Sequence, residues 1–251
     1  MSIRYTMKCG ILSTFLFTAA MVLGAGAPAL AAQYIKFQPM AEAISTPVGA
    51  VVQSDSDRVP LITWGGDIAT IVANGNAMTT VPGSSMDRKG LSITLYREDR
   101  FVKQVEAFMS GKTPYLRGTL GMIESAREVL CKDARTCPEY VYQMTYSAGG
   151  DALVVREDIK KVADLKGKTI VLQAYGPHTD FLTQVLGDAG LSPGDVTLKW
   201  VEDLTGSDNA PMAALQSDVA VDAVFVISPD AAALTHGGSG VGDSLSVKTV
   251  L

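Results

Sequence analysis

The chain has 251 residues, of which 47% are hydrophobic and 19% are charged, and its formal net charge is −5. This composition predicts a globular protein with a substantial core and excludes an intrinsically disordered chain. Because no run of Lys or Arg offsets the negative charge, the sequence argues against a nucleic-acid partner, which requires clustered basic residues.

The first 31 residues have the three parts of a secretory signal peptide. Arg4 and Lys8 give a basic start, residues 10–23 are apolar, and residues 29–31 form a small-x-small cleavage site. A membrane anchor is the alternative, but the apolar stretch is shorter than the ~20 residues that a helix needs to cross a bilayer. We therefore expect cleavage near residue 31 and a mature protein that is soluble in the periplasm.

Residues 32–58 are polar and irregular and predict an arm or linker ahead of the ordered chain. A strand is then expected over residues 59–63, followed by a glycine turn and a short helix. The turn carries four candidate ligand contacts, which are Trp64, Gly65, Gly66 and Asp67. Asp67 also suits the N-cap of the helix and Trp64 also suits the core, so both roles stay open for these two residues.

Residues 91–97 predict a second strand, and residues 101–109 predict a helix with one apolar face. A third strand is expected over residues 114–120, and its glycine turn again leads into a helix. The candidate ligand contacts at this turn are Gly118, Thr119 and Gly121.

Two cysteines, Cys131 and Cys137, remain after removal of the signal peptide and close a short loop. In an oxidising compartment they can pair, and a bridge over so few residues would stabilise the fold by about 2 kcal/mol. Their spacing is neither that of a zinc site nor that of a C-x-x-C redox pair, so we expect no metal there.

Two extended runs, residues 140–145 and 152–156, follow each other without a helix between them. This break in the alternation predicts that the backbone passes from one sheet to another, with Gly149 and Gly150 supplying the dihedral freedom of a hinge. A hairpin with a Gly-Gly turn is the alternative. Tyr146, Ser147 and Gly149 are the candidate ligand contacts of this segment.

The stretch 164–190 contains a complete strand–turn–helix unit, with an apolar strand over 168–174 and a helix over 179–188. At such an edge of an α/β sheet the first-turn N–H groups of the helix have no intrahelical partner and favour an anion. The candidates here are Tyr175, Gly176 and His178, although a plain turn is the alternative. Further strands over 196–201 and 221–226 predict a second α/β lobe.

Motifs typical of enzymes are incomplete. The Gly-Lys-Thr triplets at 111–113 and 167–169 lack the earlier glycine that a phosphate-binding loop requires, and Ser147 lacks the leading glycine of a nucleophile elbow. The sequence therefore predicts neither an enzyme nor a cofactor.

Four stretches of the sequence are informative through their order and combination. They are ITWGGDIATIVANG, RGTLGMI, SAGGDALVVREDIKKVADLKGKTIVLQAYGPHTDFL and VDAVFVISPDAAAL. In this combination the chain, from about Val59 onward, resembles the periplasmic substrate-binding proteins of ABC transporters, of the nitrate/sulfonate/taurine type. The resemblance implies a two-lobed α/β fold of the type II periplasmic-binding-protein kind, with lobes at 59–147 and 148–251. It also implies capture of a small molecule between the lobes and its delivery to an ABC permease in the inner membrane.

The resemblance further implies that strand–helix turns of both lobes hold the ligand, so that all the glycine-turn candidates named above belong to one site. Free amides after Gly121 and Gly176 suit an anionic group such as a sulfonate or a carboxylate. Trp64 offers an apolar or cation–π wall, and Asp67, if it is not a cap, meets an amine. A zwitterion of the aminosulfonate kind would satisfy both ends.

The sequence departs from the family in one respect. In such proteins the chain returns to the first lobe after the second, whereas this sequence ends at Leu251 without a visible return. We therefore expect an incomplete first lobe, in either a fragment or a truncated product. The alternative function is an enzyme on the same scaffold, similar to the relatives that make a thiamin pyrimidine from vitamin B6 and histidine.

Overall fold

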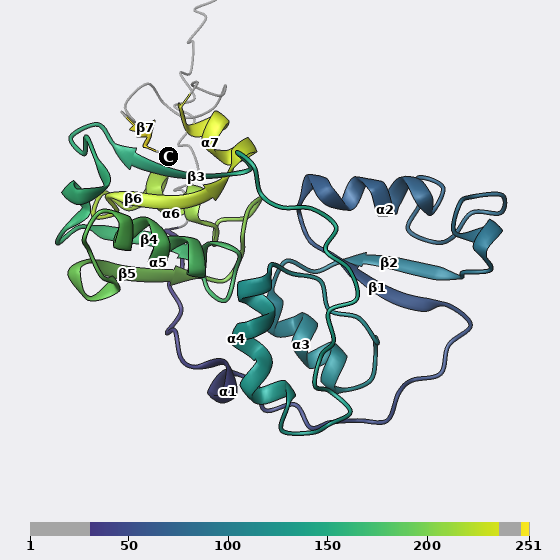
Figure 1. The fold of residues 1–251 in the computed structure, drawn as a ribbon. Helices are drawn as coiled ribbons and strands as arrows, with labels where there is room; N and C mark the ends of the chain where they lie inside the picture. The colour runs from purple at the N-terminus through teal and green to yellow at the C-terminus, as the bar shows by residue number, and fades with distance from the viewer. Residues whose placement is uncertain (1–30, 236–246, 251) are drawn as a thin grey trace, which may run out of the picture.

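The computed structural model describes residues 31–235 and 247–250 (Figure 1). In these ranges it contains two separate sheets, one of two strands and one of five. Each sheet has its own helices, so the chain forms two lobes joined by extended segments. The predicted signal peptide falls on residues 1–30, apart from its last residue, and thus lies outside the described residues.

The first lobe is built on a short parallel sheet in which β1 (Asp57–Leu61) pairs with β2 (Ile93–Arg97). Its helical segments are η1 (Gly65–Asp67), α2 (Ile68–Ala73), η2 (Asp87–Lys89), α3 (Phe101–Met109) and α4 (Leu120–Leu130). α3 buries Phe101, Val105 and Met109, which recur at four-residue spacing and pack against α4. The helical prediction for residues 101–109 is therefore confirmed.

The third strand predicted over residues 114–120 is wrong, because this segment forms no strand. The segment is instead fixed to β1 by a side chain, since the hydroxyl of Thr113 donates to the carbonyl oxygen of Arg58 at 2.6 Å. Leu116 packs against the core of α3 and α4, whereas Tyr115 and Leu120 are exposed.

The second lobe is built on a mixed sheet with the strand order β5-β4-β6-β3-β7. β4 is parallel to both neighbours, whereas β3 is antiparallel to β6 and β7. The strands are β3 (Asp151–Arg156), β4 (Thr169–Gln173), β5 (Thr197–Val201), β6 (Ala223–Ile227) and β7 (Val247–Thr249). The helical segments are η3 (Val162–Leu165), α5 (His178–Asp188), η4 (Pro193–Asp195), α6 (Pro211–Ser217) and α7 (Ser228–Thr235).

β4 is covered on both faces, as its continuous apolar sequence predicted. Val171 belongs to the core under α6 and α7, whereas Ile170 and Leu172 belong to the core under α5. All three side chains are fully buried, and each such burial is worth about 1.5–3 kcal/mol. This central strand therefore fixes the position of the turn at its carboxyl end.

The crossover segment, residues 140–150, leads from α4 to β3 without forming a strand. The two sheets stay separate on either side of it, so the predicted passage between sheets is confirmed and the hairpin alternative is not. Its first part was expected to be an apolar extended run, but Val141 and Tyr142 are 85% and 80% exposed. The segment lies over the surface and has no sheet to join.

The arm contacts both lobes. Ile35 donates its N–H to the carbonyl oxygen of Trp200 at 2.8 Å in the second lobe. Farther along, α1 (Met40–Ala43) packs against α4, and Gly49 donates to the carbonyl oxygen of Met109 at 2.8 Å in the first lobe. In Figure 1 the arm runs beneath the second lobe and around the lower side of the first.

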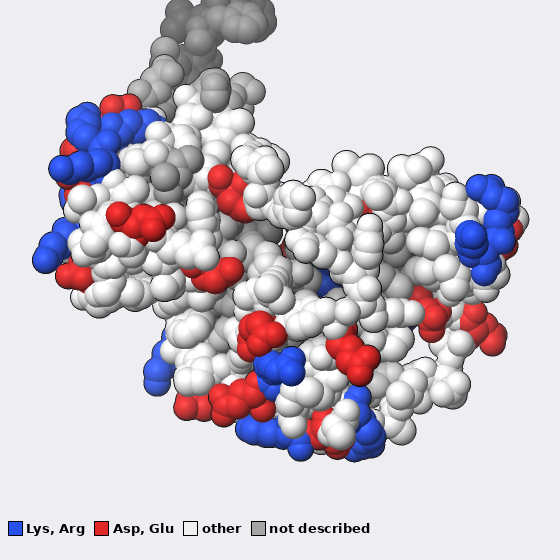
Figure 2. All heavy atoms as spheres, viewed as in Figure 1, with Lys and Arg blue, Asp and Glu red and all other residues white. Residues whose placement is uncertain are grey.

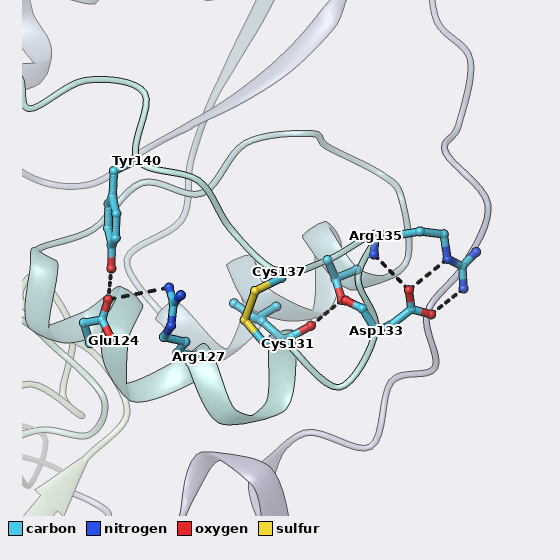
Figure 3. Close-up of a disulfide and its surroundings, with 9 residues drawn as sticks. Glu124, Arg127, Cys131, Asp133, Arg135, Cys137 and Tyr140 are labelled. Carbon is cyan, nitrogen blue, oxygen red and sulfur yellow. Dashed lines mark hydrogen bonds and ion pairs between the residues drawn. A yellow bond between two sulfur atoms is a disulfide. The ribbon is translucent and has the colours of Figure 1, made fainter.

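A disulfide joins Cys131, directly after α4, to Cys137 (Figure 3). The hydroxyl of Thr136 donates to the carbonyl oxygen of Leu130 at 2.6 Å, so the bridged loop also closes the end of the helix. Beyond the loop, the hydroxyl of Tyr140 is hydrogen-bonded to the carboxylate of Glu124 on α4. The start of the crossover is thereby tied to the first lobe.

Candidate functional site

The first predicted turn is held together by a buried ion pair. Asp67 is 2% exposed, and its Oδ1 lies 2.7 Å from Nε of Arg117. Its Oδ2 accepts the N–H of Ile62 at 2.9 Å. Of the two roles that the sequence left open for Asp67, capping is not borne out by its side chain: Asp67 holds the N-cap position of α2, but its carboxylate makes no cap hydrogen bond. Both oxygens are occupied within the first lobe.

Trp64 lies against the crossover segment. A Cβ atom added to Gly150 would clash with the Trp64 ring, and one added to Gly66 would clash with Thr145. Both glycines are therefore required by close packing between this turn and the crossover. Gly65, in contrast, has open space around its Cα atom.

The N-terminus of α4 carries the second set of predicted residues. Thr119 is the N-cap, and its hydroxyl accepts the N–H of Met122 at 3.2 Å. Arg117 also reaches this turn, since its Nη1 donates to the carbonyl oxygen of Gly118 at 3.4 Å. Gly121 lies against α5 of the other lobe, because a Cβ atom on it would be 2.6 Å from Cγ of Asp180. The N-termini of α4 and α5 thus meet across the two lobes.

The turn after β4 is strained and closely packed. Tyr175 has a φ of 58°, a left-handed conformation that is uncommon outside glycine, and its hydroxyl donates to the carbonyl oxygen of Gln38 at 2.8 Å. Gly176 lies so close to Gln173 that an added Cβ atom would clash with the amide oxygen of that side chain. Gln173 is fully buried, and this oxygen has no partner among the described residues.

His178 begins α5 and is fully buried. Its Nε2 lies 2.8 Å from Oδ1 of Asp151, and Ser147 donates its hydroxyl to Oδ2 of the same carboxylate. Burial by itself would raise the pKa of Asp151, but the hydrogen bonds from His178 and Ser147, with the charge of His178, outweigh it and lower the pKa. This network joins the crossover to the start of α5.

Two predicted residues of the crossover lie apart from this network. Tyr146 is 78% exposed, and Gly149 has open space around it with a φ of 75°. Contacts lead from Trp64 through Gly150 and Ser147 to Asp151 and His178, and α5 meets α4 at Gly121.

A cavity of about 240 Å³ lies between α4, α5 and the arm. Of the predicted residues it is lined by Gly121, Tyr175 and Gly176, and Asp180 is the charged residue in its wall. A second cavity, of about 320 Å³, is also bordered by Tyr175 and is lined by Arg100, Lys103 and Glu202 among others. In the view of Figure 2, Lys and Arg lie mainly toward the outer edges of the lobes, and acidic groups also lie near the place where the lobes meet.

Three residues at these turns escaped the sequence-based prediction, namely Arg117, Asp151 and Asp180. Each lies next to a predicted glycine turn, so its position in the sequence could have marked it as a candidate site residue. Their partners are distant in the sequence, however, and no local pattern pairs them.

In the described part of the chain, no group of three or more His, Cys, Asp or Glu side chains is arranged to hold a metal ion. No helix there has both the length and the apolar character needed to cross a membrane.

No family model and no curated protein sequence matches the chain. Its fold is similar to that of the alkanesulfonate-binding protein SsuA from Xanthomonas axonopodis pv. citri bound to MOPS, with a TM-score of 0.51 and 18% identity over 80% of this chain and 62% of that one. It is also similar to the periplasmic aliphatic sulphonate binding protein SsuA from Escherichia coli, with a TM-score of 0.51 and 18% identity over 79% of this chain and 57% of that one. The chain thus spans less than two thirds of either structure. It has the two-lobed α/β fold of the type II periplasmic substrate-binding proteins, which is the fold that the resemblance in its sequence implied.

Proposed function

We propose that this chain is a solute-binding protein that holds a small anionic or zwitterionic molecule between its lobes for import by an ABC transporter. The observation that carries the proposal is the meeting of two helix N-termini, from different lobes, beside a cavity. Gly121 of α4 and Asp180 of α5 are in contact there, and the first-turn N–H groups of both helices favour an anion.

The fold supports the same proposal, because the two SsuA structures are described as alkanesulfonate and aliphatic sulphonate binding proteins. The binding residues that we propose are the predicted ones at the turns, with the lobes taken as residues 59–147 and 148–251. Asp67 is the exception, because both of its oxygens already have partners within the first lobe. A signal peptide over residues 1–31, a location in the periplasm and a permease in the inner membrane belong to the proposal.

We propose no turnover and no cofactor. Nothing in the geometry of the described residues favours the alternative of a thiamin-pyrimidine enzyme.

A thermal-shift panel on the purified chain tests the proposal. The probes are alkanesulfonates, taurine, nitrate and amino acids, each at several concentrations. A ligand at about 100 times its Kd stabilises the folded state by about 2.7 kcal/mol, which corresponds to a rise in Tm of about 5–10 °C for a chain of this size. We expect at least one probe to raise Tm in a saturable way. The proposal would be contradicted if no probe raised Tm.

A further inference from the structure

The backbone of the crossover segment is unpaired over residues 138–147. Within the described part of the chain, none of its N–H or carbonyl groups is hydrogen-bonded to another backbone group. Its only hydrogen bond to a side chain is the one that the carbonyl oxygen of Tyr146 accepts from the hydroxyl of Thr145 at 3.3 Å. A run of free backbone groups of this length offers another chain the same template as the edge of a sheet.

The side chains of this segment form an exposed apolar patch. Tyr140, Val141, Tyr142 and Tyr146 are all more than half exposed, and Met144 is exposed as well. Single apolar residues are normal on a protein surface, but five within seven consecutive positions form a contiguous patch, which marks an interaction site. Aromatic and β-branched residues are also the types that favour a strand.

The two ends of the patch are fixed to the first lobe. The hydroxyl of Tyr140 is hydrogen-bonded to the carboxylate of Glu124 on α4. Thr145 packs against Gly66, since a Cβ atom added to that glycine would clash with the methyl group of Thr145. A segment that is already held at both ends loses less conformational freedom when it pairs with another chain.

The absence of charge in the patch favours a second copy of this chain as the partner. Residues 140–150 contain no charged side chain, although Glu139 and Asp151 flank them. A charged partner strand would lose its hydration against this run without meeting an opposite charge there. A second copy presents the same neutral, apolar run.

An antiparallel arrangement matches the run with itself. Pairing centred on Gln143 places the large side chains opposite one another in the two copies, with Tyr140 opposite Tyr146 and Tyr142 opposite Met144. Each such pair stabilises a sheet by about 0.2–1 kcal/mol. Glu139 then lies opposite Ser147, so no like charges meet. Pairing centred on Thr145 would instead place Glu139 opposite Asp151, which is unfavourable.

The exposed area suffices for a dimer of moderate affinity. A tyrosine buries about 150–250 Å², so the three tyrosines with Val141 and Met144 offer on the order of 500 Å² in each copy. Two copies would bury about 1,000 Å² in total, which is near the lower limit for a specific interface. We propose that two copies of this chain pair antiparallel through residues 140–146, about a two-fold axis at Gln143, with a Kd in the micromolar range.

Sedimentation equilibrium of the full chain at concentrations from about 1 to 100 μM tests the proposal. The chain should show a reversible equilibrium between monomer and dimer. Val141→Asp should raise the Kd of the dimer at least about 10-fold, because it places a carboxylate of each copy in the neutral interface. Val219→Asp is the matched control, because Val219 lies in the second lobe and is 92% exposed, against 85% for Val141. It should leave the Kd within about twofold.

Cysteine cross-linking tests the register. Gln143→Cys should give a disulfide between two copies under mild oxidation, because a residue on the two-fold axis faces its own copy at a Cα–Cα distance of about 4.5–5.5 Å. Val141→Cys should not, because the two cysteines would lie four positions apart, or about 13 Å along the strands. The wild-type chain, oxidised in the same way, gives the background.

A chain that stays monomeric at about 100 μM would overturn the inference and would mean that something other than a second copy covers the patch. A dimer that Val141→Asp leaves intact would also overturn it, because the interface would then lie elsewhere. Cross-linking through Val141→Cys but not through Gln143→Cys would overturn the register. None of these measurements uses a ligand, so the proposed function is tested separately.

Discussion

Removal of the Asp67 carboxylate should destabilise the protein strongly. Its side chain is 3% exposed and that of its partner Arg117 is 18% exposed. Breaking a buried pair by removing one partner typically costs about 3–5 kcal/mol, since the remaining charge stays buried and unmatched. Arg117 keeps some contact with solvent, which favours the lower end of this range of cost. The N–H of Ile62 also loses its acceptor, which adds about 1 kcal/mol to the cost. We expect Asp67→Ala to lower the free energy of unfolding by about 4 kcal/mol.

Urea unfolding, followed by circular dichroism, measures this change. Asp55→Ala is the control, because Asp55 is an exposed carboxylate in the arm, and its effect should stay within about 0.5 kcal/mol. In a double-mutant cycle, Arg117→Ala added to Asp67→Ala should cost clearly less than the sum of the single changes, with a coupling of about 1–3 kcal/mol. A stable Asp67→Ala protein that no longer binds ligand would refute the reasoning, because it would make Asp67 a ligand contact.

Three further substitutions have expected outcomes, and they concern Phe225, the disulfide and Asp218. Phe225→Ala should lower the free energy of unfolding by about 3–5 kcal/mol, because the ring is fully buried; a loss below about 1 kcal/mol in urea unfolding would contradict this. Replacing Cys131 and Cys137 by Ser should cost about 2 kcal/mol, and a reductant should then have no added effect on Tm. Hydrogen bonds from Tyr34 and a neighbouring lysine lower the pKa of Asp218 from 3.8 to about 2, so its stabilising contribution is complete above pH 3.8 and is lost as the pH falls through about 2. The stability difference between wild type and Asp218→Asn should therefore shrink between pH 5 and pH 2, and a constant difference would refute the assignment.

The sequence predicted the second lobe well because its signals are local. The strand over 169–173 is a continuous apolar run, and glycine and proline mark the turn before α5. The prediction of a third strand in the first lobe was wrong. An apolar run predicts burial, but a strand also needs a neighbouring strand to pair with, and residues 114–119 pair with none. Burial and strand pairing are separate properties, and the sequence signals only the first.

In the candidate site, too, only the features with a local sequence signal were predictable. Glycine turns were predictable, because a missing Cβ atom marks close approach, as at Gly66 and Gly121. What approaches each glycine was not predictable. Asp180 meets Gly121 across the two lobes, and Asp151 meets His178 across 27 positions of sequence. Such pairs depend on how the lobes are placed, and that placement follows from packing rather than from any local pattern.

The placement of the lobes in turn depends on more than the crossover. Gln173 of the second lobe donates to the carbonyl oxygen of Asp99 in the first lobe at 2.9 Å. The arm adds a second link, because Phe37 stacks on Trp200 at 4.3 Å only three residues before α1 packs against the first lobe. So short a connection cannot absorb a large change in the angle between the lobes. Since Phe37 also lines the cavity of about 240 Å³ between α4 and α5, any movement of the lobes that admits a ligand must shift the arm as well, and the arm thereby becomes part of the site.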